Sequence, residues 1–318
     1  MSNADPTLSI DGGAPALSLA PGATGGLPTR AFSTLAGKQP VAPETPVSLR
    51  LPALEDSIDL PCALVWGLPL ASITFGEAVE AVDRLIARGR PSFFITANLH
   101  YAMLCDRDPQ LADLSGRAAF LLADGMPMVW YSRLLGTPLP ERVTGADLLL
   151  ALCQRAAQRG HCVFLLGAAP EVARTAAANL TARYPGLKIV GVQSPPCRPL
   201  SEEEHRALVT QIRQSHADLL FLAFGQPKGE RWLDEHCQSL GVPACVQIGA
   251  ALDFAAGRLR RAPRWMQRMG LEWAYRVLGE PGRLAPRYFR NALFLVRAIL
   301  GDFGVTLARW IRRLVGQR

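Results

Sequence analysis

Short apolar runs alternate with helical patterns between about residues 63 and 248 of this chain. The runs are rich in Leu, Val, Ile and Phe, as buried strands are, and they predict strands at residues 63–65, 92–96, 119–123, 162–166, 188–192, 219–223 and 244–248. The intervening segments predict helices at residues 74–88, 109–116, 145–159, 170–184, 201–215 and 229–240. This alternation predicts an α/β, Rossmann-like fold with a largely parallel sheet and helices on both faces.

Two flanking segments differ from this core, which we place at residues 61–257. Residues 1–60 are rich in Pro, Ala, Gly, Ser and Thr, which predicts a disordered or loosely ordered extension. Residues 258–318 show a helical pattern with fourteen arginines and three acidic residues, in a chain of net charge +7. The rest of the chain is therefore net acidic. A basic appendage of this kind indicates an anionic partner: a phosphate-bearing substrate, an anionic lipid or nucleic acid.

Composition argues against several classes of protein. With 49% hydrophobic residues, the chain is too apolar to be disordered throughout. Its seven cysteines form no C-x-x-C pair and no metal-ligand spacing, which indicates reduced thiols and no zinc site. We see no secretory leader and no apolar stretch of spanning length, so the sequence predicts a soluble or peripheral protein.

Polar residues and glycines directly follow five of the predicted strands. Ligands of parallel sheets bind beyond the carboxyl ends of the strands, so these five clusters predict a common site. The clusters are residues 96–98, Asp124 with Gly125, Gly167, residues 225–228 and residues 249–253.

Asp124 and Arg142 are the sharpest candidates for chemistry. A carboxylate at a strand end can take a proton from a substrate hydroxyl, which predicts Asp124 as a general base; the alternative is that it caps a helix beginning near Met126. Arg142 suits a diphosphate because its planar fork donates two hydrogen bonds, and a surface arginine is the other interpretation. Residues 106–108 match a D-x-D string that can bind a metal, but they also resemble a helix cap, and we predict no required metal ion.

The order of several longer strings resembles the WecG/TagA/CpsF glycosyltransferases. The resemblance covers roughly residues 63–290. It rests on TAN at 96–98, ADG at 123–125, RLLG at 133–136, ERVTGADLL at 141–149, FLLGAAPEVA at 164–173, YPGLKIVG at 184–191, AFGQPKGERW at 223–232, GAALDFAAGRLRRAPRWMQRMGLEW at 249–273 and YRVLGEPGRL at 275–284.

The resemblance implies an inverting enzyme that moves a sugar from a UDP-sugar to an undecaprenyl-diphosphate-linked sugar, without a cofactor. It implies that Asp124 is the general base and that arginines of the basic appendage close over the donor diphosphate. The residues that it places at the substrates are Thr96, Asn98, Arg142, Asp253, Arg276, Arg283 and Arg287, and we add Gln226 and Lys228 from the cluster at 225–228.

One position departs from the family's usual pattern. Relatives read P-K-Q-E where this chain reads Pro227, Lys228, Gly229 and Glu230, so a site glutamine is missing and Gln226 is a candidate replacement. Two other functions stay open as alternatives. A nucleotide-sugar-modifying enzyme would carry a dinucleotide fingerprint, and a nucleic-acid-binding protein would use the basic appendage alone.

Residues 288–315 interleave arginines with large apolar residues. This pattern predicts a helix that lies on an anionic membrane, or else packs on the core or on a neighbouring subunit. We therefore expect a cytoplasmic protein, peripheral on the inner face of the membrane, with no nucleic-acid partner. The donor sugar, the acceptor glycan, the pathway and a homo-oligomeric state stay open at this stage.

Overall fold

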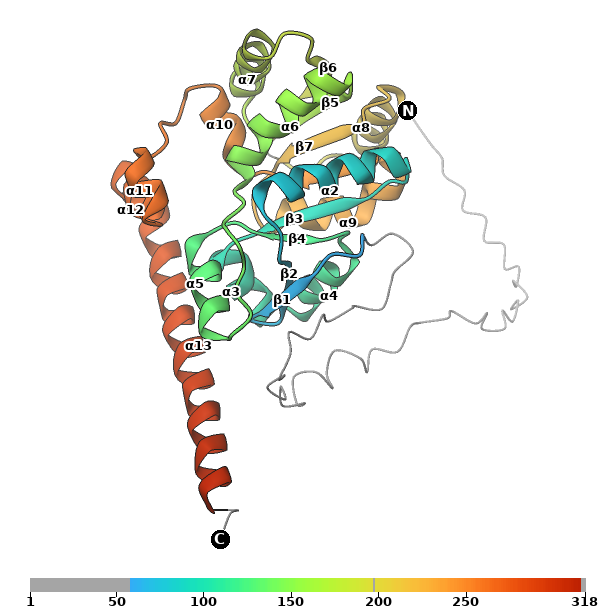
Figure 1. Cartoon of the computed structure of the whole chain (residues 1–318). Helices are drawn as coiled ribbons and strands as arrows, with labels where there is room; N and C mark the ends of the chain where they lie inside the picture. The colour runs from blue at the N-terminus through green and yellow to red at the C-terminus, as the bar shows by residue number, and fades with distance from the viewer. Residues whose placement is uncertain (1–57, 197, 316–318) are drawn as a thin grey trace, which may run out of the picture. The chain divides into compact units, whose positions relative to one another are not determined.

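The computed structural model describes residues 58–196 and 198–315, with side chains described up to residue 301. The extension predicted for residues 1–60 therefore lies almost entirely outside the described residues. Within them, eight strands form a single sheet in the order β1-β2-β4-β3-β8-β7-β5-β6 (Figure 1). The strands are β1 (Cys62–Val65), β2 (Leu68–Ala71), β3 (Phe93–Ala97), β4 (Leu121–Ala123), β5 (Cys162–Gly167), β6 (Lys188–Gln193), β7 (Leu219–Ala223) and β8 (Ala244–Gln247).

Every neighbouring pair of strands is parallel except β1 and β2, which confirms the predicted α/β fold. In the middle of the sheet, β3 lies between β4 and β8. The chain builds β4 on one side of β3 and later strands on the other, so the connections diverge at this point. A parallel sheet opens a crevice for ligands where its connections diverge, which places the expected site beyond the ends of β3, β4 and β8.

Helices cover both faces of the sheet because successive residues of a strand point to opposite sides. On β5, Val163 and Leu165 belong to one core cluster, whereas Phe164 and Leu166 belong to the other. The first cluster is covered by α2 (Phe75–Arg88), α6 (Gly145–Arg159), α7 (Pro170–Arg183) and α10 (Ala251–Ala255). The second is covered by α3 (Leu99–Arg107), α4 (Pro109–Arg117), α5 (Met126–Leu134), α8 (Glu202–Gln214) and α9 (Lys228–Leu240).

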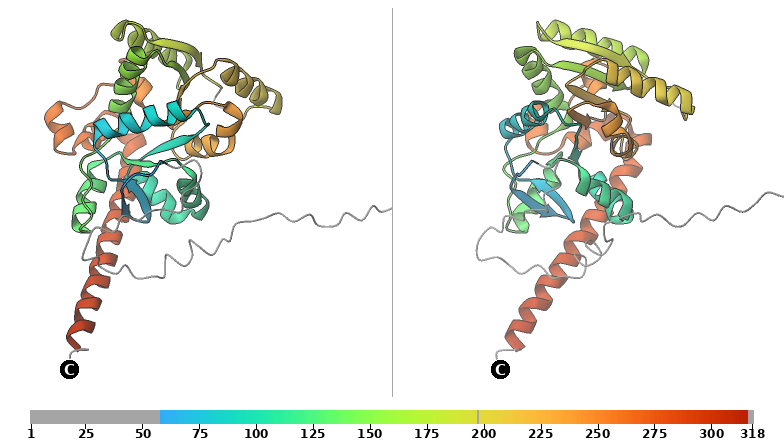
Figure 2. Two further views of the ribbon diagram at one scale, coloured as in Figure 1. Left: turned by 45° about the vertical axis from the view of Figure 1, so that its right-hand side comes forward. Right: turned by 90° about the vertical axis from the view of Figure 1, so that its right-hand side faces the viewer.

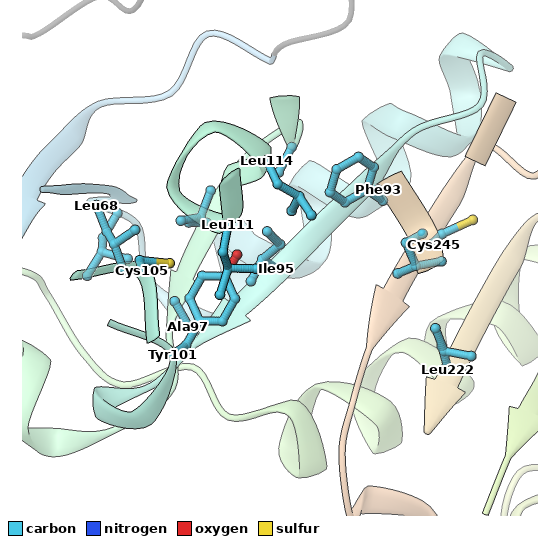
Figure 3. Packing of buried hydrophobic residues seen from close by; sticks show 14 of the residues in the cluster. Leu68, Phe93, Ile95, Ala97, Tyr101, Cys105, Leu111, Leu114, Leu222 and Cys245 are labelled. Carbon is cyan, nitrogen blue, oxygen red and sulfur yellow. The ribbon is translucent and has the colours of Figure 1, made fainter. Parts of the chain in front are cut away.

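The core on the second face packs α3 and α4 against β3, as the close view in Figure 3 shows. Tyr101 of α3 is fully buried there among Ile95 and Leu111. Its hydroxyl lies 2.8 Å from the Ser115 hydroxyl, so the polar end of this side chain has a partner inside the core. This packing fixes α3, the helix that begins directly after Asn98.

The strand β2 and the helix α3 are among the elements that were not predicted. The strand β2 is short and contains Pro69, which cannot donate to a ladder, so its pattern is weak. It forms a hairpin with β1 through Trp66 and Gly67, whose φ angles are 49° and 79°. The helix α3 was missed because its start depends on the Asn98 side chain, which accepts hydrogen bonds from the backbone N–H groups of His100 and Tyr101.

Side chains cap the starts of two predicted helices. Thr74 and Glu77 form a capping box at the start of α2. Asp108 accepts hydrogen bonds from the backbone N–H groups of Gln110 and Leu111 at the start of α4, so the D-x-D string ends in a helix cap. Asp106 instead faces Arg297, with a nitrogen-to-oxygen distance of 3.6 Å.

The predicted basic helical segment is present as α11 (Arg264–Arg268), α12 (Glu272–Gly279) and the 35-residue α13 (Pro281–Val315). Figure 2 shows from two further directions how α13 continues from α12 and runs on past the sheet. It is joined to the core by the buried side chains of Asn291 and Phe294. Among the described residues, no helix is both long enough and apolar enough to span a membrane.

Candidate active site

The ends of β3 and β4 bring Thr96 and Asp124 onto neighbouring strands. Thr96 is paired with Leu122, and the Asp124 backbone N–H donates to the Ala97 carbonyl at 2.8 Å. The Thr96 hydroxyl turns to the third strand of the group and donates to the Gln247 carbonyl of β8 at 3.2 Å. Two residues that the sequence placed in one site therefore lie beside each other at the carboxyl end of the sheet.

Asp124 is held at the start of α6 and does not cap the helix that follows it. The N-cap of α5 is Gly125, and no side chain caps that helix, so the alternative interpretation of Asp124 as a cap is wrong. Its carboxylate instead accepts a hydrogen bond from the Gly145 backbone N–H at 3.4 Å. Burial raises the pKa of Asp124 to about 6, against smaller lowering effects from Gly145 and Arg142. A carboxylate of this pKa is well matched to proton transfer near neutral pH.

Arginines from three elements surround Asp124. Arg142 and Arg276 lower its pKa and Arg287 is also within electrostatic range, which brings the loop before α6 together with α12 and α13. Burial lowers the pKa of Arg287, and the charges of Arg276 and Arg283 lower it further, so these cations are close to one another. Like charges repel, and a group of arginines so close together therefore favours an anion between them.

Arg142 is no ordinary surface arginine, because only 16% of its side chain is exposed. It pairs with Glu272 of α12, with 3.3 Å between Nη1 and Oε2. Glu272 also pairs with Arg261 at 3.3 Å, and Arg261 in turn contacts Asp147 of α6. Sequence reasoning did not single out Glu272 or Arg261, because each pairs with a residue more than 100 positions away, Glu272 with Arg142 and Arg261 with Asp147.

The loop between β7 and α9 completes one side of the site. Asn98 donates to the Gln226 side-chain oxygen at 3.0 Å, and Gln226 in turn donates to the Thr96 carbonyl at 3.4 Å. The three predicted residues Thr96, Asn98 and Gln226 are thus linked directly. Lys228, the first residue of α9, is exposed beside this loop, with its ammonium 5.5 Å from the centre of the Phe224 ring.

Two predicted residues, Asp253 and Arg283, are connected to the residues around Asp124 only indirectly. Asp253 lies on α10 and pairs with Arg258 at 3.6 Å, but its neighbour Phe254 has the Arg276 guanidinium 5.8 Å from its ring centre. Arg283 is exposed and pairs at 2.6 Å with Glu280, which directly precedes α13. The helices that carry both residues lie next to the arginines around Asp124, although neither side chain contacts Asp124 in the described contacts.

Comparison with known proteins shows which family the chain belongs to. The family model of the glycosyl transferase WecG/TagA/CpsF family matches residues 63–305, which is most of the chain. The chain belongs to this family. It is also 30% identical over 196 residues to an N-acetylglucosaminyldiphosphoundecaprenol N-acetyl-beta-D-mannosaminyltransferase of Bacillus spizizenii, which covers 62% of this chain and 74% of that relative. This WecG/TagA/CpsF protein is accordingly a glycosyltransferase.

The glycosyltransferase also contains a buried carboxylate that the sequence did not single out. Glu230 of α9 is 1% exposed, and among the described residues neither carboxylate oxygen has a hydrogen-bond partner of normal geometry. Burial raises its pKa to about 7, while Gln226 and Arg287 lower it to a smaller extent. The Nε of Arg287 also lacks a partner in the part of the chain that the structure describes, and nearby His100 is bonded to Asn291 at 3.0 Å. Incompletely satisfied polar groups therefore lie under the start of α13.

We expect Glu230→Gln to stabilise the protein more at pH 8 than at pH 5. The unfolded chain titrates near the ordinary value of 4.5 and the folded chain near 7, so the folded state holds the proton more tightly. Glu230 therefore lowers the free energy of unfolding as pH rises through this window. The gain of the variant over wild type should increase by up to about 3 kcal/mol across it. Denaturant unfolding at both pH values measures the gain, with exposed Glu203→Gln as the control, and an equal gain at pH 5 and pH 8 would contradict the assignment.

Proposed function

We propose that this glycosyltransferase moves a sugar, with inversion, from a UDP-sugar to a sugar linked to undecaprenyl diphosphate. The observation that carries the proposal is Asp124, a partly buried carboxylate with a raised pKa beside several arginines. Asp124 takes the proton of the acceptor hydroxyl while the hydroxyl oxygen attacks the anomeric carbon. The bond from that carbon to the diphosphate breaks at the same time, and UDP leaves. A single displacement of this kind inverts the anomeric configuration.

Arginines supply the positive charge that the leaving group requires. Negative charge develops on the diphosphate as the glycosidic bond breaks, and preorganised cations stabilise it in the transition state. Arg142, Arg276 and Arg287 all lie within electrostatic range of Asp124, so a donor placed for attack would bring its diphosphate to them. On this proposal the transfer needs no metal ion and continues in the presence of a chelator.

The relative from Bacillus spizizenii suggests which substrates to test first. Its name describes transfer of an N-acetylmannosaminyl group to N-acetylglucosaminyldiphosphoundecaprenol. We propose an acceptor of the same class for this chain, a single acetamido sugar on undecaprenyl diphosphate, and UDP-N-acetylmannosamine as the first donor. The departure at Gly229 is the reason to include other UDP-sugars in the donor panel.

The proposed acceptor is anchored in a membrane, and the helical segment carries a surface suited to that location. Phe289, Leu293, Val296 and Leu300 are between 54% and 65% exposed and recur along one side of α13. Exposed arginines lie among them at 290 and 297. Further exposed apolar side chains on α5, α11 and α12 are Trp130, Leu134, Leu135, Trp265, Met269, Trp273 and Leu278. We propose that this surface holds the enzyme at the cytoplasmic face of the membrane.

Replacing two residues of this surface is expected to release the protein from vesicles. Leu293→Glu combined with Val296→Glu removes two side chains that would be buried among lipids, each worth about 1.5–3 kcal/mol. Recovery with anionic vesicles in a flotation assay should fall at least about tenfold. Val190→Glu on β6 changes an exposed apolar residue elsewhere and should float like wild type. Unchanged flotation of the double variant would contradict contact through α13.

The transfer itself is tested by measuring UDP release from a donor panel with a synthetic lipid-diphosphate-sugar acceptor, with and without chelator. Release that depends on the acceptor and survives chelator supports the proposal and identifies the donor. Bound nicotinamide absorbance would favour the nucleotide-sugar-modifying alternative. Salt-sensitive DNA binding without any binding of sugar nucleotides would favour the nucleic-acid alternative.

A further inference from the structure

Gly229 is the second residue of α9, and there is no room for a side chain at this position. A Cβ atom there would lie 2.7 Å from the side-chain amide carbon of Gln247 and 3.0 Å from its Cγ. Such distances are shorter than real Cβ contacts. Gly76 provides the comparison, because it is also the second residue of a helix and a Cβ there would meet nothing within 4 Å. The side chain of Gln247 on β8 therefore leaves space only for glycine at position 229.

Gln247 is buried, with 2% exposure, and its amide group is satisfied by the end of β7. In the amide orientation that satisfies both of its polar atoms, the nitrogen donates to the Leu222 carbonyl at 2.6 Å and the oxygen accepts from the Gly225 backbone N–H at 2.9 Å. Its own backbone carbonyl accepts from the Thr96 hydroxyl. One residue of β8 is thus bonded both to a site residue on β3 and to the loop that follows β7.

The loop held by Gln247 carries Gln226, which reaches back to the same site residues. Gln226 is bonded to the Asn98 side chain and to the Thr96 carbonyl. Gly225, at the bend of the loop, has a φ of 79°, and its N–H is the group that Gln247 binds. Without the Gln247 amide, the Gly225 N–H would lose this acceptor, and the Leu222 carbonyl would keep only the backbone N–H of Ile248. The loop that carries Gln226 would then be held less firmly against β8.

We propose that Gln247 is a positioning residue of the transfer reaction. From β8 it fills the space that a side chain at residue 229 would occupy, and it holds residues 224–228 against Thr96 and Asn98. The family resemblance showed a glutamine missing at 229, and here a glutamine reaches the same place from the neighbouring strand. The nearest atoms beside Gly229 all belong to Gln247, whereas Gln226 is bonded to Asn98 and to the Thr96 carbonyl. This inference rests on the proposed function, since it concerns the same site.

An exchange of the two residues tests the inference. Gly229→Gln places a second side chain in filled space, and Gln247→Gly leaves the loop without its partner. Each is expected to lower kcat/KM by about tenfold or more. The double variant Gly229→Gln with Gln247→Gly restores one amide to the shared space and should recover most of the loss. Gly76→Gln makes the same change at the matched position of α2, which is open, and should behave like wild type.

The measurement is kcat and donor KM by UDP release, together with the melting temperature of each variant. Assays run well below every melting temperature, where a purely structural defect leaves kcat and KM unchanged. Lowered kcat or raised KM in both single variants, with recovery in the double variant, supports positioning by Gln247. Wild-type kinetics in either single variant, or losses that simply multiply in the double variant, would overturn it. If the wild-type protein transferred no sugar to any acceptor, the proposed function would be overturned. If the wild type is active and the variants behave like it, only the inference about Gln247 is overturned.

Discussion

Asp124→Asn is expected to lower kcat for sugar transfer by about a hundredfold to ten-thousandfold, the usual contribution of a general base. Asparagine has nearly the same shape, and its side-chain oxygen can still accept from the Gly145 backbone N–H. It cannot take a proton from the acceptor hydroxyl. The fold should be kept, because the substitution replaces a carboxylate whose charge is disfavoured by burial. Single-turnover transfer and circular dichroism of the purified variant measure the two effects separately.

The pH dependence of the transfer rate is a second test of Asp124 as the general base. With a pKa raised to about 6, Asp124 is protonated in acid, so the rate of the wild-type enzyme should fall as pH drops through this value. Asp113→Asn on α4 is the control, because it changes a carboxylate in the same way on a helix away from the site. A rate for Asp124→Asn within a few-fold of wild type would remove Asp124 as the base, whatever the folding of the variant.

Arg287→Ala should cost about a hundredfold in kcat, as the removal of one donor to a developing anion does in other enzymes. Arg287 is partly buried and lies within electrostatic range of both Asp124 and Glu230, so its charge is less screened than that of a surface arginine. Arg287→Lys keeps the charge but loses the planar fork, and we expect an intermediate rate. UDP release with saturating donor and acceptor is the measurement.

Exposed Arg84→Ala on α2 serves as the control for Arg287, since it removes one arginine at a distance from the site. Its rate should equal that of wild type. If Arg287→Ala matched Arg84→Ala, the arginines of α13 would have no part in the chemistry. The helix would then serve only as a membrane contact, and the flotation assay on the α13 variants would still test that role.

The sequence was sufficient to place the candidate site residues at the ends of the strands. Asp124 and Thr96 follow apolar runs directly, and the end of a run can be read locally. Parallel pairing then brings the ends together without further information. β2 was hidden because a four-residue strand with Pro69 has little pattern of its own. Helix α3 was hidden because its start depends on one asparagine side chain.

The contacts that tune the site could not be predicted in the same way. Glu272 reaches Arg142 across 130 positions of sequence, and only the packing of α12 on the core creates that pair. Glu230 looks like an ordinary residue in the first turn of a helix, where an exposed glutamate is common. Its side chain is instead buried, within electrostatic range of Arg287 of α13. Gln247 ends an apolar strand, and its link to Gly229 appears only when β7 and β8 are placed side by side.

The carboxylate of Glu272 is a counter-ion, supplied by the protein itself, for the arginines beside it. It lies against Arg142 and Arg261 with only 18% of its side chain exposed. On the proposed function, a donor diphosphate that binds Arg142 displaces the Glu272 carboxylate from it, so one anion replaces another beside this arginine. Its binding would then release fewer dissolved ions than the number of arginines suggests. Affinity for the donor should accordingly depend only weakly on salt, and a ligand without the diphosphate would have nothing with which to displace the glutamate.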